Sequence, residues 1–326
     1  MKVSVVVTVG NDACNLRKCL DSLAAQTLLE FEIICVDGGS DDQSCKVLKE
    51  YAAKDSRLTV LPQKNPNRGA ARNRGLDAVS GNYVVFLDDD VMCAPSLLEK
   101  MYSRATAVEA DVVVCNGRAF DLSSGRNSRV SNYFRVSELR RRAVFSVKDF
   151  PRHILTLANP VPWNKCYRRR FLRQENLRFQ ELSDSSDLYM VLLALCVAHR
   201  ISYVDEPLVI RCKKGRAHLE AHKSSAPLCF IEALAALHDE LQRRQIYSLV
   251  ERDFVSMAAQ LTAWNVVTAG GWSSRVAILR SLEDEKFAKM SILGRPRAYY
   301  TELSQYCGAR FVQGTLRLYK LLHGKP

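Results

Sequence analysis

Three consecutive carboxylates, Asp88, Asp89 and Asp90, directly follow an apolar run over residues 83–87. A run of this length, rich in β-branched and aromatic residues, predicts a central strand that is covered on both faces. Side chains alternate along an extended chain, so Asp88 and Asp90 should lie on the same side. Two oxygen ligands at a strand end suit Mn²⁺ or Mg²⁺; the alternative is a solvated acidic turn. An arginine or lysine of the chain on these oxygens would argue against the metal and the enzyme built on it.

The composition of the 326 residues, with 47% hydrophobic and 25% charged side chains, is ordinary for a globular protein. We find no apolar run long enough to span a membrane and no signal peptide, and the 11 cysteines show no metal-binding spacing, so we expect a cytoplasmic protein. The net charge of +12 includes basic clusters at 135–142 and 168–178. No nucleic-acid motif accompanies them, which leaves a solvated face or an anionic ligand.

Strands and helices alternate over residues 1–117, and this pattern predicts an α/β fold: a mostly parallel sheet with helices on both faces. Residues 118–162 are polar and irregular, with weak helical character over 137–145. A helix over 185–199 and a strand over 201–211, interrupted at Pro207, come next. From about residue 224 the pattern is entirely helical. The strands expected in the first part are 3–8, 31–36, 58–61, 83–87 and 111–115.

Six segments, in this order and at these spacings, resemble glycosyltransferase family 2. The resemblance implies an inverting enzyme of the Rossmann-like GT-A fold that uses a nucleotide-sugar donor. It implies a glycosyltransferase domain over 1–212, with a nucleotide-sugar-binding half (1–117) and an acceptor-binding half (118–212), followed by a helical C-terminal region (213–326). The segments are Thr8-Val9-Gly10-Asn11, residues 36–41, 69–75, 86–90, 163–169 and 179–187.

The family pattern assigns roles to individual residues. A divalent Mn²⁺ or Mg²⁺ held at Asp88 and Asp90 would stabilise the leaving diphosphate. Asp187 would be the general base that takes the proton of the acceptor hydroxyl, with Asp184 as the second candidate. A helix that begins near Asp187 would favour its charged form. The donor nucleotide is assigned to Thr8, Val9, Asp37, Arg72, Asp88 and Asp89, and the acceptor to Trp163, Asn164 and Lys165.

Three positions depart from the family pattern. Gly10 replaces an aromatic residue that would stack on the base. Gly38 replaces an acid that reads uracil in some members, although a UDP-sugar is still the favoured donor. Ser186 replaces the Glu of a Glu-Asp pair, so the base role rests on Asp187 alone.

We therefore expect a sugar transfer to a saccharide or a lipid-linked acceptor in cell-surface polysaccharide or glycolipid synthesis. The alternatives are a non-catalytic basic protein that binds polyanions or anionic lipid, and a sugar-phosphate nucleotidyltransferase. The mixed basic and apolar helix over 310–322 leaves two options: a peripheral contact with the inner face of the membrane, or packing on the domain or on a second copy in a homo-oligomer.

Overall fold

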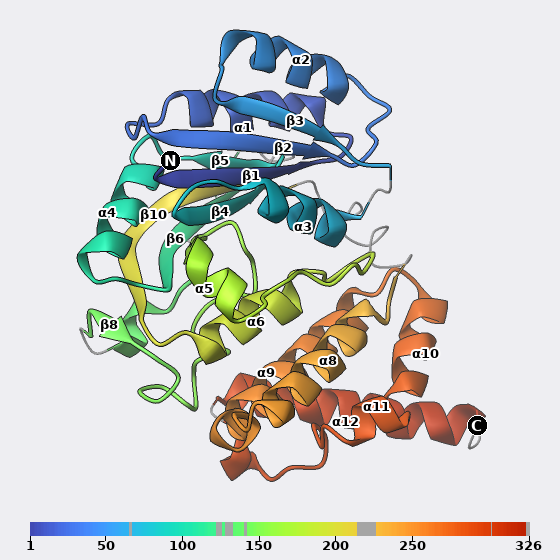
Figure 1. The fold of residues 1–326 in the computed structure, drawn as a ribbon. Coiled ribbons are helices and arrows are strands. Elements are labelled where there is room, and N and C mark those ends of the chain that lie inside the picture. Colours follow the sequence, from blue (N-terminus) through green and yellow to red (C-terminus); the bar gives the residue numbers. More distant parts are fainter. Residues whose placement is uncertain are drawn as a thin grey trace.

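The computed structural model describes residues 1–64, 67–121, 126–127, 133–139, 142–213, 226–300 and 302–323. In these ranges, ten strands form one mixed sheet with the order β3-β2-β1-β4-β9-β6-β10-β5, while β7 pairs with β6 and β8 with β10 (Figure 1). Four neighbouring strands, β3, β2, β1 and β4, run parallel to one another. The α/β sheet with helices on both faces is therefore confirmed.

The first part of the chain alternates strands and helices as expected. Asp12 caps α1 by accepting a hydrogen bond from the amide of Asn15, and Asn67 caps α3 in the same way through Ala70. The elements are β1 (Val3–Val9), α1 (Ala13–Ala24), β2 (Phe31–Asp37), α2 (Ser44–Lys54), β3 (Leu58–Pro62), α3 (Arg68–Ala78), β4 (Tyr83–Asp88), β5 (Val91–Cys93) and α4 (Leu97–Ala107).

The middle of the chain completes the sheet. The strand expected at 111–115 is longer. Of the region 137–145, where weak helical character was expected, residues 137–139 belong to a short 3₁₀ helix and residues 144–145 to a strand, while residues 140–141 lie outside the described ranges. Pro207 does interrupt the last strand, because the register with β6 shifts on both sides of it. The elements are β6 (Val112–Asp121), β7 (Arg126–Asn127), η1 (Val136–Leu139), β8 (Val144–Phe145), β9 (Lys165–Arg168), α5 (Arg169–Gln174), α6 (Leu188–Val197) and β10 (Ile201–Lys213).

Alternate side chains of the central strand β1 face two separate hydrophobic cores. Val5 and Val7 pack with Leu16 and Leu97, so α1, α2 and α4 cover one face. Val6 packs with the opposite core, where α3, α5 and α6 cover the sheet. Burial on both faces explains why these strands are continuous apolar runs.

The C-terminal helices extend the second core, because α8 packs on α6 and α9 packs on α8 (Figure 1). Asp253 of α9 is fully buried and accepts hydrogen bonds from the Leu155 amide (2.6 Å) and the Thr156 hydroxyl (2.7 Å). These helices therefore hold the segment before β9 in place. They are α8 (Cys229–Arg243), α9 (Tyr247–Thr268), α10 (Trp272–Ser281), α11 (Glu285–Ala288), η2 (Arg297–Tyr299) and α12 (Leu303–His323).

Helix α12 packs on α9, and its Val312 and Tyr319 are buried. Its outer side exposes Phe311, Leu318 and Leu321. No helix within the described ranges is long and apolar enough to cross a membrane. A peripheral membrane contact, a homo-oligomer and the division of the chain at residue 212 stay predictions.

Candidate active site

The parallel strands β1, β2 and β4 end side by side, and their carboxyl ends gather several of the predicted site residues. The register places Thr8 opposite Asp88 and Val9 opposite Asp37. The Thr8 hydroxyl donates to Asp88 Oδ1 (3.1 Å). This edge is where open α/β sheets bind their ligands.

Arg72 joins this edge to the start of α6. Its Nη2 donates to Asp88 Oδ1 (2.7 Å) and its Nη1 donates to the Ser186 hydroxyl (3.2 Å). All three side chains are buried. Burial by itself would raise the pKa of Asp88, but Arg72, Arg68 and Arg211 outweigh it and hold that pKa well below its usual range.

Two glycines let α3 approach closely enough to bring Arg72 into this position. A Cβ at Gly75 would lie 2.3 Å from a methyl carbon of Val6 on β1, and one at Gly69 would lie 1.9 Å from the carbonyl oxygen of Gln180. Neither position has room for a side chain. The glycines therefore allow α3 to pack closely against β1 and the backbone of Gln180.

Asp90 faces Arg211 at the end of β10. Arg211 Nε donates to Asp90 Oδ2 (3.3 Å), while the Cys212 amide donates to the Asp90 carbonyl (2.8 Å). Asp90 Oδ1 is buried and has no hydrogen-bond partner among the described residues. Burial raises the pKa of Asp90 above its ordinary value, against the opposing charge of Arg211. One oxygen of this carboxylate thus remains available to a cation.

The third acid, Asp89, is turned toward the protein. It is 2% exposed, and its Oδ2 accepts a hydrogen bond from the Gly10 amide (2.8 Å). Burial raises the pKa of Asp89 to about 7. In this structure the carboxylate fixes the loop after β1, and a contact of Asp89 with the donor stays a prediction.

Other predicted donor contacts have partners within the protein. The Asp37 carboxylate accepts from the Ser40 amide (3.0 Å), the Ser40 hydroxyl (2.7 Å) and Cys45 Sγ (3.0 Å). Burial alone would raise the pKa of Asp37, but these hydrogen bonds lower it overall. The Val9 side chain belongs to the core beneath α1, so only its backbone reaches the edge. Arg72 is 2% exposed and donates to Asp88, and its expected contact with the donor stays a prediction.

Asp187 immediately precedes α6 and is partly buried. Its carboxylate makes no hydrogen bond or ion pair with another of the described residues. Burial raises the pKa of Asp187, whereas the charge of Arg72 opposes the rise. Desolvation therefore opposes the charged form that the helix terminus was expected to favour. A carboxylate with a raised pKa and no internal partner can accept a proton.

The three residues expected to contact the acceptor lie in the interior. Trp163 is 1% exposed and packs edge-on against Tyr133 (ring centroids 4.6 Å apart). Asn164 donates to the Cys115 carbonyl (2.9 Å). Lys165 donates to the carbonyls of Asn159 (2.9 Å) and Val161 (2.8 Å). These contacts shape the loop before β9, and contacts of these three residues with the acceptor stay a prediction.

Sequence reasoning missed Arg68 and Arg211. Arg68 is the first residue of α3, and its pKa is raised, first by the charge of Asp88 and also by those of Asp89 and Asp90. Arg68 directly precedes the family-like segment 69–75, and this position could have suggested that it lies near the site. Arg211 reaches the acids because β10 pairs with β5, a contact over more than a hundred residues that no local pattern reveals.

The acids do not form a preassembled metal cluster. Within the ranges that the structure describes, no group of three or more His, Cys, Asp or Glu side chains is arranged to hold a metal ion. Thr8 and Arg72 both donate to Asp88 Oδ1. An arginine of the chain therefore lies on one of the acids, which is the arrangement that we expected to argue against a metal ligand. Arg211 likewise bonds one oxygen of Asp90, but Asp90 Oδ1 is buried and has no hydrogen-bond partner among the described residues.

Comparison with known sequences identifies the family. The profile of Glycosyl transferase family 2 matches residues 4–175. The protein EpsH of Bacillus subtilis (strain 168) is 34% identical over 213 residues, which are 63% of this chain and 59% of that protein. Glycosyltransferase GlyA of Streptococcus pneumoniae is 32% identical over 222 residues, which are 66% of this chain but 31% of GlyA. The chain thus matches less than two thirds of the length of either relative.

Solved structures agree in fold. TarS 1–349 of S. aureus, in complex with UDP-GlcNAc, matches with a TM-score of 0.65 at 19% identity, over 98% of this chain and 92% of that one. The mannosyltransferase PcManGT of Pyrobaculum calidifontis, with GDP-Man and Mn²⁺, matches with a TM-score of 0.53 at 14% identity, over 100% and 88% of the two chains. These matches confirm the expected GT-A fold, and with the profile match over more than half of its length, the chain belongs to glycosyltransferase family 2.

Proposed function

We propose that this protein transfers a sugar, with inversion, from a nucleotide-diphosphate donor to the hydroxyl of a saccharide or lipid-linked acceptor. The observation that carries the proposal is the bridge through Arg72, which fixes the start of α6 beside the acid-tipped end of β4. A proton acceptor, Asp187, and a diphosphate-binding edge thereby share one side of the sheet. Family membership favours this reaction over the nucleotidyltransferase and the non-catalytic polyanion-binding protein.

In this proposal Asp187 removes the proton of the acceptor hydroxyl while that oxygen attacks the anomeric carbon. The bond from that carbon to the diphosphate breaks on the opposite face, and the nucleoside diphosphate leaves with the electron pair. Arg68 and Arg211 lie among the acids and carry positive charge toward the leaving group. Arg72 holds Asp88 and the start of α6 in their relative positions through its two hydrogen bonds, and it does not itself react.

The residues fit a divalent cation held mainly by Asp90, whose Oδ1 is buried without a partner. Mg²⁺-type sites commonly use one or two carboxylates, with substrate phosphates and waters completing the shell. When bound, Mn²⁺ or Mg²⁺ would stabilise negative charge on the leaving diphosphate.

Replacing Asp90 by alanine should weaken Mn²⁺-dependent UDP binding by at least about tenfold, because the cation loses its main protein ligand. Titration calorimetry with UDP and with GDP, each with and without Mn²⁺, measures the effect and the preferred base. The matched control is Asp205→Ala, an exposed carboxylate on β10. Equal Mn²⁺ dependence in wild type and Asp90→Ala would exclude Asp90 as a ligand.

The pH dependence of turnover should report the base. Since burial raises the Asp187 pKa above 3.8, kcat should fall as the pH falls through this raised value, because protonated Asp187 cannot accept a proton. Measuring kcat against pH at saturating donor gives this acid limb. Asp89, whose pKa is about 7, could produce a similar limb, so Asp89→Asn is the control. Loss of the limb in Asp89→Asn would assign it to Asp89 and contradict the proposal.

A UDP-sugar donor, supported by likeness to a protein solved with UDP-GlcNAc, is the form of the proposal to test first. GDP-sugars are the direct comparison, because a structure with GDP-Man shows the same fold. We place the product in the class of cell-surface polysaccharides or glycolipids.

A further inference from the structure

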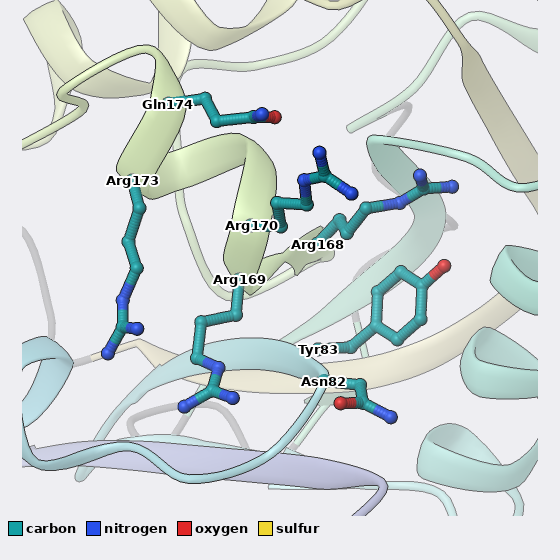
Figure 2. A pocket seen from close by; sticks show the side chains of 7 residues that line it. All are labelled: Asn82, Tyr83, Arg168, Arg169, Arg170, Arg173 and Gln174. Carbon is teal, nitrogen blue, oxygen red and sulfur yellow. The ribbon is translucent and has the colours of Figure 1, made fainter.

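Four arginines line a cavity at the end of the sheet opposite the candidate active site. The cavity has a volume of about 370 Å³ and is lined by Asn82, Tyr83, Arg168, Arg169, Arg170, Arg173 and Gln174 (Figure 2). Tyr83 begins β4, whereas Asp88 ends it, so the two sites lie roughly 17 Å apart along the strand. A ligand in this cavity would not compete with the sugar donor for space.

Two of the arginines are anchored by the protein and retain unused donors. Arg168 Nε donates to the Ala110 carbonyl (3.2 Å), and Arg169 Nη1 donates to the Val79 carbonyl (3.1 Å). Each guanidinium carries five N–H donors, so most donors of both groups remain for a ligand. The side chains are half-buried, which limits their freedom before anything binds.

Little negative charge offsets this cluster. Within the described part of the chain, Asp111 is the carboxylate at ion-pair distance from it, 3.9 Å from Arg168 Nε. Arg170 and Arg173 are exposed and form no ion pair with a described residue. The Asp77 carboxylate, whose pKa Arg173 helps to lower, is already hydrogen-bonded to Arg178 (2.5 and 2.9 Å).

The choice of residue also indicates an anion with a defined shape. The four cationic positions are all arginine, although lysine would serve a merely solvated face equally well. The planar guanidinium matches phosphate oxygens in pairs, which an ammonium group does not. In the view of Figure 2, the side chains of Arg168 and Arg170 extend toward one side, and those of Arg169 and Arg173 toward the other.

We propose that this arginine cavity binds a phosphate-bearing anion, at a site separate from the sugar-donor site. The phosphate can come from a free pyrophosphate-type molecule or from the headgroup of an anionic phospholipid. In the second case the cavity would hold the enzyme at a lipid surface. The cavity stands independently of the proposed sugar transfer, since it uses none of the same residues.

The double variant Arg170→Gln/Arg173→Gln should bind pyrophosphate about tenfold more weakly than wild type, because two charge-assisted contacts are lost. Calorimetry in EDTA removes divalent cations and so suppresses diphosphate binding at Asp90. The matched control, Lys46→Gln/Lys49→Gln on α2, removes the same charge from an exposed surface and should bind like wild type. Arg170→Lys/Arg173→Lys, which keeps charge and loses the planar fork, should give an intermediate affinity.

Flotation with phosphatidylcholine vesicles, with and without phosphatidylglycerol, separates the two sources of phosphate. If the glutamine variant also loses binding to the anionic vesicles, the ligand is a headgroup; if it loses pyrophosphate alone, the ligand is free in solution. The proposal is overturned if the glutamine variant matches wild type in both assays, or if the lysine-to-glutamine control loses as much binding. Thermal unfolding of each variant checks that its fold is retained.

Discussion

Replacing Asp187 by asparagine should lower kcat by about 10²-fold or more while the affinity for the nucleotide-sugar stays close to wild type. The amide keeps the size of the side chain at the start of α6 but cannot take the acceptor proton. The donor edge is formed by other strands, so its geometry should survive. Steady-state kinetics, together with titration of UDP in the presence of Mn²⁺, separates the two effects.

Asp184 provides the matched control, because it is a carboxylate three residues away in the same segment. Its Oδ1 accepts a hydrogen bond from the Ser185 amide (2.7 Å), so it already has a partner. We expect Asp184→Asn to retain wild-type turnover. If Asp184→Asn loses turnover and Asp187→Asn keeps it, the base is Asp184 and our assignment is wrong.

Replacing Arg72 by methionine should lower the free energy of unfolding by about 3–5 kcal/mol. The cost arises because Asp88, which is 4% exposed, is left buried without its main compensating charge. In wild type the Asp88 pKa lies below its ordinary value of 3.8, so the stabilisation is present above that pH and is lost as the pH falls through the lower folded value. Urea unfolding followed by circular dichroism measures the difference.

The exposed pair Arg178–Asp77 is the control for the buried one, since both are aspartate–arginine pairs with close contacts. Arg178→Met should cost no more than about 1 kcal/mol, because solvent screens an exposed pair. The double variant Arg72→Met/Asp88→Asn should recover part of the lost stability by removing the uncompensated charge. Equal losses in Arg72→Met and Arg178→Met would show that the buried bridge does not contribute as proposed.

Much of the fold was predictable because local patterns carry it. The run over 83–87 is apolar since β4 is covered on both faces, and the helices around it show the usual spacing of buried residues. Strand β9 was not predictable in this way. It is four residues long and lies antiparallel between β4 and β6, so distant chain segments place it there.

In the candidate site, too, local motifs predicted some features, whereas others depend on distant parts of the chain. Asp88, Asp90 and Asp187 were proposed as site residues from motifs that occur in the family order, and their roles stay predictions. The partners of these acids depend on side-chain directions that a motif does not contain. Arg72 was assigned to the donor and also donates to Asp88, while Lys165 was assigned to the acceptor and also donates to backbone carbonyls.

The start of α6 links Asp187 to the remainder of the protein, since α8 packs on this helix and Asp253 of α9 fixes the segment before β9. Exchanging the C-terminal helices for those of another family member would therefore alter the packing around the proposed base, Asp187. Functional chimaeras should require that the α6 surface and the incoming helices be exchanged together. If a new acceptor preference evolves by changes in the C-terminal helices, the α6 surface that packs on them must change as well.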